Sequence, residues 1–450
     1  MRLFIKTAFL VFFLALATYL VLYFSPDQAL EPEAAAWLKL EPIDYSATQN
    51  SYFTLMGFLA PVDHDPRQFG ITRTKAWAQA IENHEKTGAE PDAAAIARTH
   101  PETSMPVDKR FADLCVMSAQ NCLSWYAEHG ETVAELSGVY APWLARYQSL
   151  YQKPRYHDPI GARHVNMPPP NFRTMLNMQQ LHHAQLLAHY TQGEHDIALS
   201  QLADDLSYAR SLLANNNHLI TKMVAVKMIV DIFHVYSQFL DGKRIPLALL
   251  QTIAKLPALD TAEKNMQQVE HTEFQALHYT NITQSEQSRQ TGMFDKLLSA
   301  LLSYKPNATM NHAFSQYREA AQYGNLSPEA LLEIRSQASA GLFWWHYGYN
   351  MTGALLVEIS NPAHHVGYAL RIQALDGLLN LLKLKARFRA EGRSLSAFPE
   401  FLENQRGNAP GLFKAHPVQW DEKYKRLYYN VPKAAESVLK PIYRVLYSAE

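Results

Sequence analysis

The hydrophobic and polar positions of this chain form two patterns, a continuous apolar run at the N-terminus and a helical periodicity behind it. From Ala8 to Phe24 there is no charged residue, and Phe4–Phe24 makes 21 residues of mainly apolar character. A membrane-spanning helix needs about 20 such residues. Lys6 is near enough to the start to bring its ammonium to the headgroups. We therefore expect residues 4–24 to contact the lipid bilayer as a transmembrane helix.

A cleaved signal peptide is the alternative interpretation of this run. Signal peptides have an apolar centre of about 7–15 residues and a cleavage site of the small-x-small type. Here the apolar centre is longer, and the residues that follow it offer only Asp27-x-Ala29. The pattern favours a retained anchor.

The charges that flank the run predict its orientation. Arg2 and Lys6 precede it, whereas Asp27 and Glu31 follow it. Positive charge tends to stay on the cytoplasmic side of a membrane. We expect a single-pass protein with a cytoplasmic N-terminus and its bulk on the outer side, which in a bacterium means an inner-membrane protein with a periplasmic body.

The rest of the chain is dominated by helical periodicity. Between Glu194 and Ala214 the apolar residues recur every three to four positions, which keeps one helix face apolar. Leu219–Leu240 is apolar nearly all round, but its charged residues would be costly in lipid, so a helix central to a soluble core is expected there. Its polar stripe consists of Lys227, Asp231, His234 and Gln238, and it also carries Lys222.

The same reasoning predicts the other elements. Helices are expected at 51–60, 72–86, 122–153 with a kink or break at Pro142, 171–192 closed by Gly193, 246–255, 260–290, 292–304, 311–323, 328–339 and 361–391 followed by Gly392. Loops are expected at 91–108 and 154–170, a β-hairpin with aromatic residues on both arms at 418–430, and a short helix at 433–447.

These elements define a fold class and a division of the chain. The fold is predicted to be mainly α, an irregular antiparallel helical stack with one N-terminal transmembrane helix and a small C-terminal β-hairpin. The expected segments are 1–25 (N-terminal transmembrane anchor), 26–50 (linker), 51–160 (N-terminal helical region with the cysteine pair), 161–360 (central helical core) and 361–450 (long helix, hairpin and terminal helix).

Two segments near the C-terminus, 361–404 and 409–430, carry a resemblance. They are similar to the closing module of a group of membrane-anchored, mostly helical bacterial proteins, which end in a long helix, an FP-x-FL-like segment and a small hairpin. The resemblance covers about the last 90 residues well and the anchor only in general terms. It implies a bacterial, outward-facing protein, and it implies no activity and no catalytic residue.

Composition removes one class of partner. The chain has 41 Lys and Arg against 42 Asp and Glu, and a formal net charge of −1. A nucleic-acid-binding domain is expected to be clearly basic. We therefore expect no nucleic-acid partner.

Cys115 and Cys122 are the only cysteines. On one continuous helix seven residues would separate them by roughly 10 Å, whereas a disulfide needs Cα atoms within about 7 Å. The pair can form a disulfide only if the chain turns between them, and Ser118 and Asn121 suit such a turn. A disulfide is favoured, with two unpaired buried thiols as the alternative.

Nineteen histidines raise the question of a metal site. Pairs seven residues apart share a helix face but are roughly 10 Å apart along the axis, and one metal ion needs ligands about 2 Å away. We therefore expect packed or solvated histidines, with no metal and no cofactor. The weak candidates for metal ligands are His182, His189, Glu270, His271, Glu273 and His278.

The densest aromatic cluster is at 343–349. A buried core segment is the favoured interpretation, and a docking surface for a partner, a ligand or the bilayer is the alternative. The side chains that would form that surface are Phe343, Trp344, Trp345, Tyr347 and Tyr349.

Catalytic motifs do not decide the function. The sequence has no G-x-S-x-G, H-E-x-x-H, Walker A or G-x-G-x-x-G motif. Two hypotheses follow, a membrane-anchored periplasmic binding or scaffold component of the cell envelope, which is favoured, and an envelope enzyme with an unrecognised His/Glu site that could hold a metal. The catalytic residues of such an enzyme are unknown.

Overall fold

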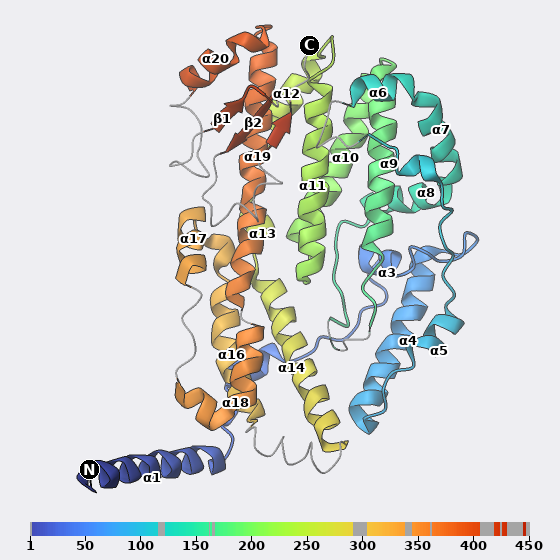
Figure 1. Cartoon of the computed structure of the whole chain (residues 1–450). Coiled ribbons are helices and arrows are strands. Elements are labelled where there is room, and N and C mark those ends of the chain that lie inside the picture. Colours follow the sequence, from blue (N-terminus) through green and yellow to red (C-terminus); the bar gives the residue numbers. More distant parts are fainter. Residues whose placement is uncertain are drawn as a thin grey trace.

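The computed structural model is mainly helical, with a small antiparallel sheet near the C-terminus (Figure 1). It describes residues 2–115, 122–161, 163, 167–290, 304–337, 344–360, 362–405, 418–423, 425–429 and 444–446. The first helix, α1, extends away from one end of a helical body.

The helices follow one another through short connections. In the first half they are α1 (Arg2–Phe24), α2 (Pro32–Trp37), α3 (Ser51–Met56), α4 (Pro66–Thr87), α5 (Ala93–Thr99), α6 (Leu123–Glu128), α7 (Gly130–Val139), α8 (Ala141–Ser149), α9 (Phe172–Thr191) and α10 (His195–Ala214). In the second half they are α11 (Leu219–Phe239), α12 (Leu247–Lys255), α13 (Thr261–Lys264), α14 (Gln267–Gln290), α16 (Pro306–Ala320), α17 (Pro328–Gln337), α18 (Trp344–Ile359), α19 (Val366–Ala390) and α20 (Phe398–Gln405).

The core is centred on α11, which packs against α9, α10 and α19. Most of its side chains are buried, including His234 and Gln238 of the predicted polar stripe. The exposed side of the stripe is occupied by a salt bridge between Lys227 and Asp231. The prediction of a central, nearly all-apolar helix is confirmed.

Local sequence signals explain several helix ends. The carboxylate of Asp65 accepts a hydrogen bond from the Gln68 amide at 2.7 Å and so caps α4, which begins with proline. After α9 and after α19 the chain turns through Gly193 and Gly392, both with positive φ. Both glycines lie where the sequence predicts a helix to end.

Two glycines bring α3 and α4 into backbone contact. A Cβ added to Gly57 would lie 1.9 Å from the carbonyl oxygen of Pro66, and one added to Gly70 would lie 1.7 Å from that of Phe53. Any larger residue at either position would force the two helices apart. The pattern of apolar residues gives no sign of this contact.

Several predicted boundaries need correction. The predicted loop 91–108 contains α5, and the predicted helix 260–290 is two helices. The second difference arises because Asp260 and Glu263 form a capping box around the single turn of α13, after which Asn265 is extended. As predicted, the helix expected at 122–153 divides at Pro142, which lies in the first turn of α8.

At the C-terminus the predicted hairpin is confirmed and extended. Strands β1 (Val418–Asp421) and β2 (Arg426–Tyr429) pair antiparallel, with Trp420 opposite Leu427. Strand β3 (Arg444–Leu446) then pairs with β2, so the prediction of helix over 433–447 is wrong at these residues. Pro441, which lacks an amide donor, already weakens that prediction in the sequence.

Some predictions fall outside the described residues. They are the helix at 292–304 apart from its last residue, the turn residues Ser118 and Asn121, and the part of the terminal helix before β3.

Residues 26–50, expected as a linker, lie against the body. The side chain of Ala34 is buried in a cluster with Phe274 and Phe314. The ring of Trp37 meets the ring of Phe314 edge to face, with the centroids 5.2 Å apart. The chain is therefore held to the body directly after α1.

Candidate functional site

The first candidate site is the junction between the end of α1 and the start of α16. The Asp27 carboxylate accepts hydrogen bonds from the amides of Asn307 at 2.8 Å and Ala308 at 3.0 Å, which are free donors at the first turn of α16. The negative charge also suits the positive end of the helix dipole. Asp27 thereby caps α16 from a segment 280 residues away.

Lys305 makes the opposite connection. Its ammonium donates hydrogen bonds to the carbonyl oxygens of Tyr23 at 3.2 Å and Ser25 at 2.7 Å, at the C-terminal end of α1. Carbonyl groups in the last turn of a helix have no partner within the helix, and a cation there is favourable. Asp27 and Lys305 therefore join the ends of α1 and α16 through two charged side chains.

Asn350 connects α18 to the same point. Its backbone departs from helical geometry inside α18, with φ −149° and ψ 64°. Its amide group is buried and hydrogen-bonds Lys305 and the hydroxyl of Thr309, at 2.8 Å for each of the two shorter bonds. Gly353 leaves room for this arrangement, because a Cβ there would lie 1.9 Å from the Thr309 hydroxyl.

The aromatic cluster at 343–349 lies at the start of α18. The Tyr349 hydroxyl donates to the carbonyl oxygen of Pro26 at 2.9 Å, and the Lys305 ammonium is 5.7 Å from the centre of its ring. Tyr349 thus contacts the juxtamembrane segment rather than a deep core. Of the other members, Phe343 lies outside the described residues, and Trp344, Trp345 and Tyr347 are described only as helical backbone.

A cavity of about 280 Å³ lies at this junction. It lies between the segment after α1, α16 and α18, and its wall is part polar and part apolar. Its residues include Gln28, Glu31, Asn311, His312, Gly353 and Val357. Polar groups that converge on a partly apolar cavity are typical of a small-ligand or peptide site.

The weak candidates for metal ligands do not form one site. His182 is buried in α9, whereas His189 near the end of the same helix hydrogen-bonds Glu194 at 2.5 Å. His271 donates through Nε2 to the carbonyl oxygen of Trp37, also at 2.5 Å. Among the described residues no group of three or more His, Cys, Asp or Glu side chains could hold a metal ion.

Glu270 pairs with a histidine that the sequence does not single out as a ligand. Its carboxylate is 2.8 Å from Nδ1 of His365, and the Glu270 side chain is fully buried. Burial raises the pKa of Glu270, while the carboxylate, despite burial, raises the pKa of His365. Burial lowers the pKa of the remaining candidate His278, and Glu273 is close enough to oppose ionisation of Glu270.

A second buried polar group, missed in the sequence, joins α8, α9 and α10. Asp205 is fully buried and accepts hydrogen bonds from the Tyr147 hydroxyl and from Nε2 of His183, the latter at 2.7 Å. Burial opposes ionisation, but these bonds hold the pKa of Asp205 below its usual value. Single polar residues inside apolar helix faces are the only sequence signal of this group.

His182 lies beside this buried group without joining it. Its ring is 6.0 Å from that of Tyr147, centre to centre, and neither nitrogen finds a hydrogen-bond partner in the described part of the chain. Burial lowers the pKa of His182 to about 4, so the ring is neutral at physiological pH. Because these side chains are enclosed by helices, their arrangement indicates a structural role in the core.

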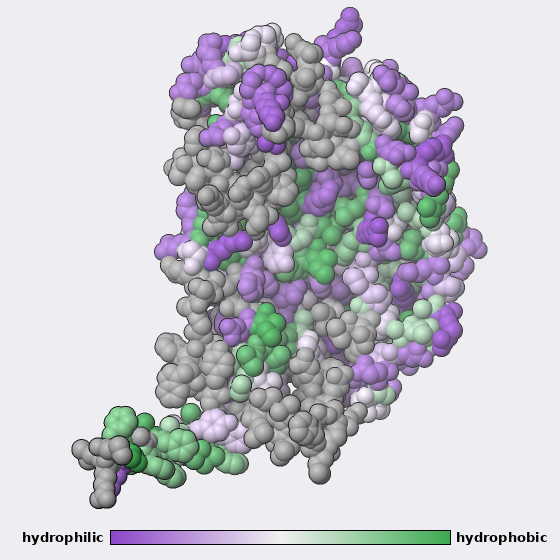
Figure 2. Space-filling view, in the orientation of Figure 1, coloured by the Kyte–Doolittle hydropathy of each residue, from purple (hydrophilic) through white to green (hydrophobic). Residues whose placement is uncertain are grey.

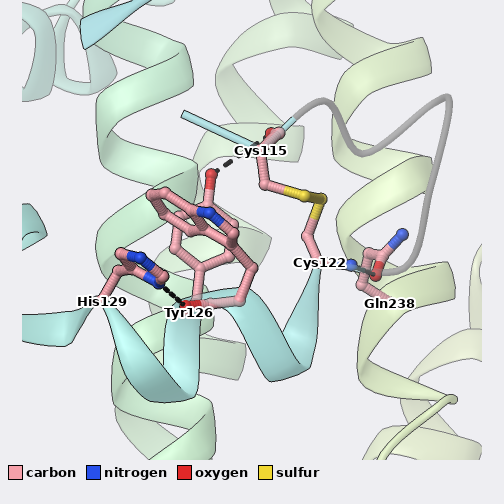
Figure 3. Close-up of a disulfide and its surroundings, with 6 residues drawn as sticks. Cys115, Cys122, Tyr126, His129 and Gln238 are labelled. Carbon is pink, nitrogen blue, oxygen red and sulfur yellow. Dashed lines mark hydrogen bonds between the residues drawn. A yellow bond between two sulfur atoms is a disulfide. The ribbon is translucent and has the colours of Figure 1, made fainter. Parts of the chain in front are cut away.

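The predicted cysteine pairing is present at the start of α6. Figure 3 shows the disulfide between Cys115 and Cys122, whose Cα atoms are 5.7 Å apart. The Cys122 amide donates to the side-chain carbonyl of Gln238 in α11 at 2.8 Å, and the Tyr126 hydroxyl donates to the Cys115 carbonyl at 3.3 Å. The bridge is therefore attached to the central helix.

Comparison with known proteins assigns no relative to this chain. No family model, no curated protein and no solved structure matches it. The resemblance of the C-terminal module thus gains no support from these comparisons, and the function has to be argued from the junction itself.

Proposed function

We propose that this chain is a single-pass membrane-anchored protein of the bacterial cell envelope, with a periplasmic body that serves as a binding or scaffold component. In the described part of the chain α1 is the one helix long and apolar enough to cross a bilayer, and it is fully exposed over that window. Basic residues before it and acidic residues after it support the outward orientation of the body.

The observation that carries the proposal is the double connection made by Asp27 and Lys305. A flexible linker would let a tethered domain move freely above the membrane. Here charged hydrogen bonds join the end of α1 to the N-terminus of α16 without an intervening spacer. A fixed body suits a protein that holds a partner at a set height and orientation.

The cavity at the junction supports a binding role. Its opening lies where the chain leaves α1, and its polar side chains can accept and donate hydrogen bonds to a polar small molecule or peptide segment. The proposed partner is an envelope component that reaches this juxtamembrane cavity.

Covalent crosslinking in cells followed by purification from membranes tests the binding role. We expect the wild-type chain to return the same partner in repeated preparations. The double variant Asp27→Ala/Lys305→Ala should return less of it, because its body is no longer held in place. Asp63→Ala, which changes an exposed turn, is the control and should behave as wild type. Repeated recovery of no specific partner would contradict the proposal.

A topology reporter tests the location. A C-terminal fusion to an enzyme that is active only outside the cytosol should give activity in intact cells. Activity restricted to a cytosol-dependent reporter would exclude a periplasmic body, whatever the crosslinking result.

The second candidate, an envelope enzyme with a His/Glu site, rests on the Glu270–His365 pair. This pair brings an imidazole and a carboxylate within 2.8 Å in a buried setting. A stoichiometric metal in the purified protein, lost in Glu270→Gln, would favour it. A metal-free protein whose Glu270→Gln and His271→Ala variants retain wild-type behaviour would remove it.

A further inference from the structure

One face of α18 carries a row of exposed apolar side chains. Met351, Leu355 and Ile359 are four residues apart, and 37%, 41% and 78% of their surfaces are exposed. Residues at this spacing share one face of a helix. The opposite face packs on α16 and includes the buried residues Ala354 and Val357.

This row differs from the other exposed apolar residues of the described body. The remaining large ones occur one to an element and include Val62, Val107, Ile197 and Leu247. Single exposed apolar residues are normal on soluble proteins, whereas a contiguous apolar patch marks an interaction surface. Figure 2 shows a hydrophobic patch over α18, near the end of the hydrophobic helix α1.

The position of α18 identifies what covers this face. α18 packs against α1, and Tyr349 at its start is hydrogen-bonded to Pro26, two residues after α1 ends. The apolar row therefore starts where the chain leaves the proposed span. We propose that the Met351–Leu355–Ile359 face of α18 lies in the boundary between headgroups and acyl chains, as a second bilayer contact beside α1.

The chemistry of the face suits this location. A helix that lies in the membrane interface has one apolar face in the acyl boundary and a different face toward water or protein. On α18 the second face is already covered by α16, so the apolar row is the face left for lipid. Two membrane contacts would fix the body more firmly than one helix can. The inference rests on the proposed retention of α1 in the bilayer.

Fluorescence quenching in reconstituted vesicles tests the inference. The full-length chain carries one added cysteine, Leu355→Cys or Ile359→Cys, labelled with an environment-sensitive dye under non-reducing conditions that keep the native disulfide closed. The vesicles contain a phospholipid with a nitroxide near the carbonyl end of its acyl chain. Leu14→Cys reports on α1, and Val107→Cys, at a residue 97% exposed on the body, is the aqueous control.

We expect the nitroxide lipid to reduce the emission at residues 355 and 359 well below that of the residue 107 control. If residues 355 and 359 lose no more emission than the control while residue 14 is quenched, the α18 contact is wrong and the anchor stands. This holds whether they are open to aqueous iodide, as on a free surface, or shielded from it, as by a protein partner or second copy. If residue 14 also escapes quenching, the anchor itself is wrong.

Discussion

The side-chain amide of Asn350 pairs with the backbone of Lys305 in both directions. The Asn350 Oδ1 accepts from the Lys305 amide at 2.8 Å, and its Nδ2 donates to the Lys305 carbonyl oxygen at 3.3 Å. The side chain of the same lysine reaches the last carbonyls of α1. Lys305 is thus the residue at which α1, α16 and α18 meet.

Asn350→Ala tests the strength of this meeting point. The substitution leaves the Lys305 amide and the Thr309 hydroxyl without their partner, and an unsatisfied buried donor costs about 1–3 kcal/mol. We expect the free energy of unfolding to fall by that amount in denaturant titrations of detergent-solubilised protein. Asn325→Ala, at an exposed asparagine, should change it by less than about 0.5 kcal/mol. Equal effects of the two variants would show that the pairing contributes nothing.

Gly70→Ala and Gly138→Ala should have opposite signs. At Gly70 the new methyl group would meet the carbonyl oxygen of Phe53, which is backbone and cannot rotate away. Overpacking of this kind costs about 1–3 kcal/mol or more. At Gly138 in α7 nothing lies within 4 Å, and alanine in place of glycine should stabilise the helix by up to about 1 kcal/mol. Thermal unfolding of both variants checks the pair, and a stabilised Gly70→Ala protein would rule out the close contact of α3 and α4.

Reduction of the disulfide should lower stability. The bridge joins residues seven apart, and closing a loop of this size is expected to contribute about 2.5 kcal/mol through the unfolded chain. We expect a lower denaturant midpoint with a thiol reductant present, and a comparable loss in Cys115→Ala/Cys122→Ala. Alkylation of the denatured protein before reduction should modify neither cysteine, whereas labelling of both would show that the bridge does not form.

Lys222 predicts a rise in stability with pH. It is almost fully buried in α11, and burial lowers the pKa of its ammonium from 10.5 to about 7. Between these values the unfolded chain holds a proton that the folded chain has released, so the free energy of unfolding rises by up to about 1.4 kcal/mol per pH unit. Lys222→Met should remove this slope between pH 7 and 10 and raise stability near pH 7.

Lys227→Met on the same helix is the control for that measurement. Lys227 is exposed and paired with Asp231, so its replacement should leave the pH slope as in wild type. A slope in Lys222→Met as steep as that of wild type would mean that Lys222 keeps its proton in the folded protein.

The fold was predictable as far as local patterns reach. Apolar spacing predicts α9, α10, α11 and α19 because each buries one face or nearly all of its surface, and Gly193 and Gly392 mark their ends through backbone geometry. The strand β3 was not predictable, because its partner β2 supplies the hydrogen bonds and no local pattern records them. The close contact of Gly57 with α4 has the same origin.

The site was largely beyond the sequence. Asp27 and Lys305 are ordinary charged residues in their own segments, and only the folded chain brings them to each other's helix ends across about 280 residues. The histidine spacing led to six weak metal candidates, yet the buried partners of Asp205 are His183 and Tyr147. The cysteine pair could be predicted because two residues seven apart leave one geometric question to answer.

The most direct test of the account is the intact mass of the protein purified from washed membranes. A retained α1 predicts a chain of the full 51.1 kDa that stays with the membrane through an alkaline wash. A mature chain shorter by about 30 residues or fewer at its N-terminus, recovered in the soluble fraction, would show a cleaved signal peptide and contradict the anchored body.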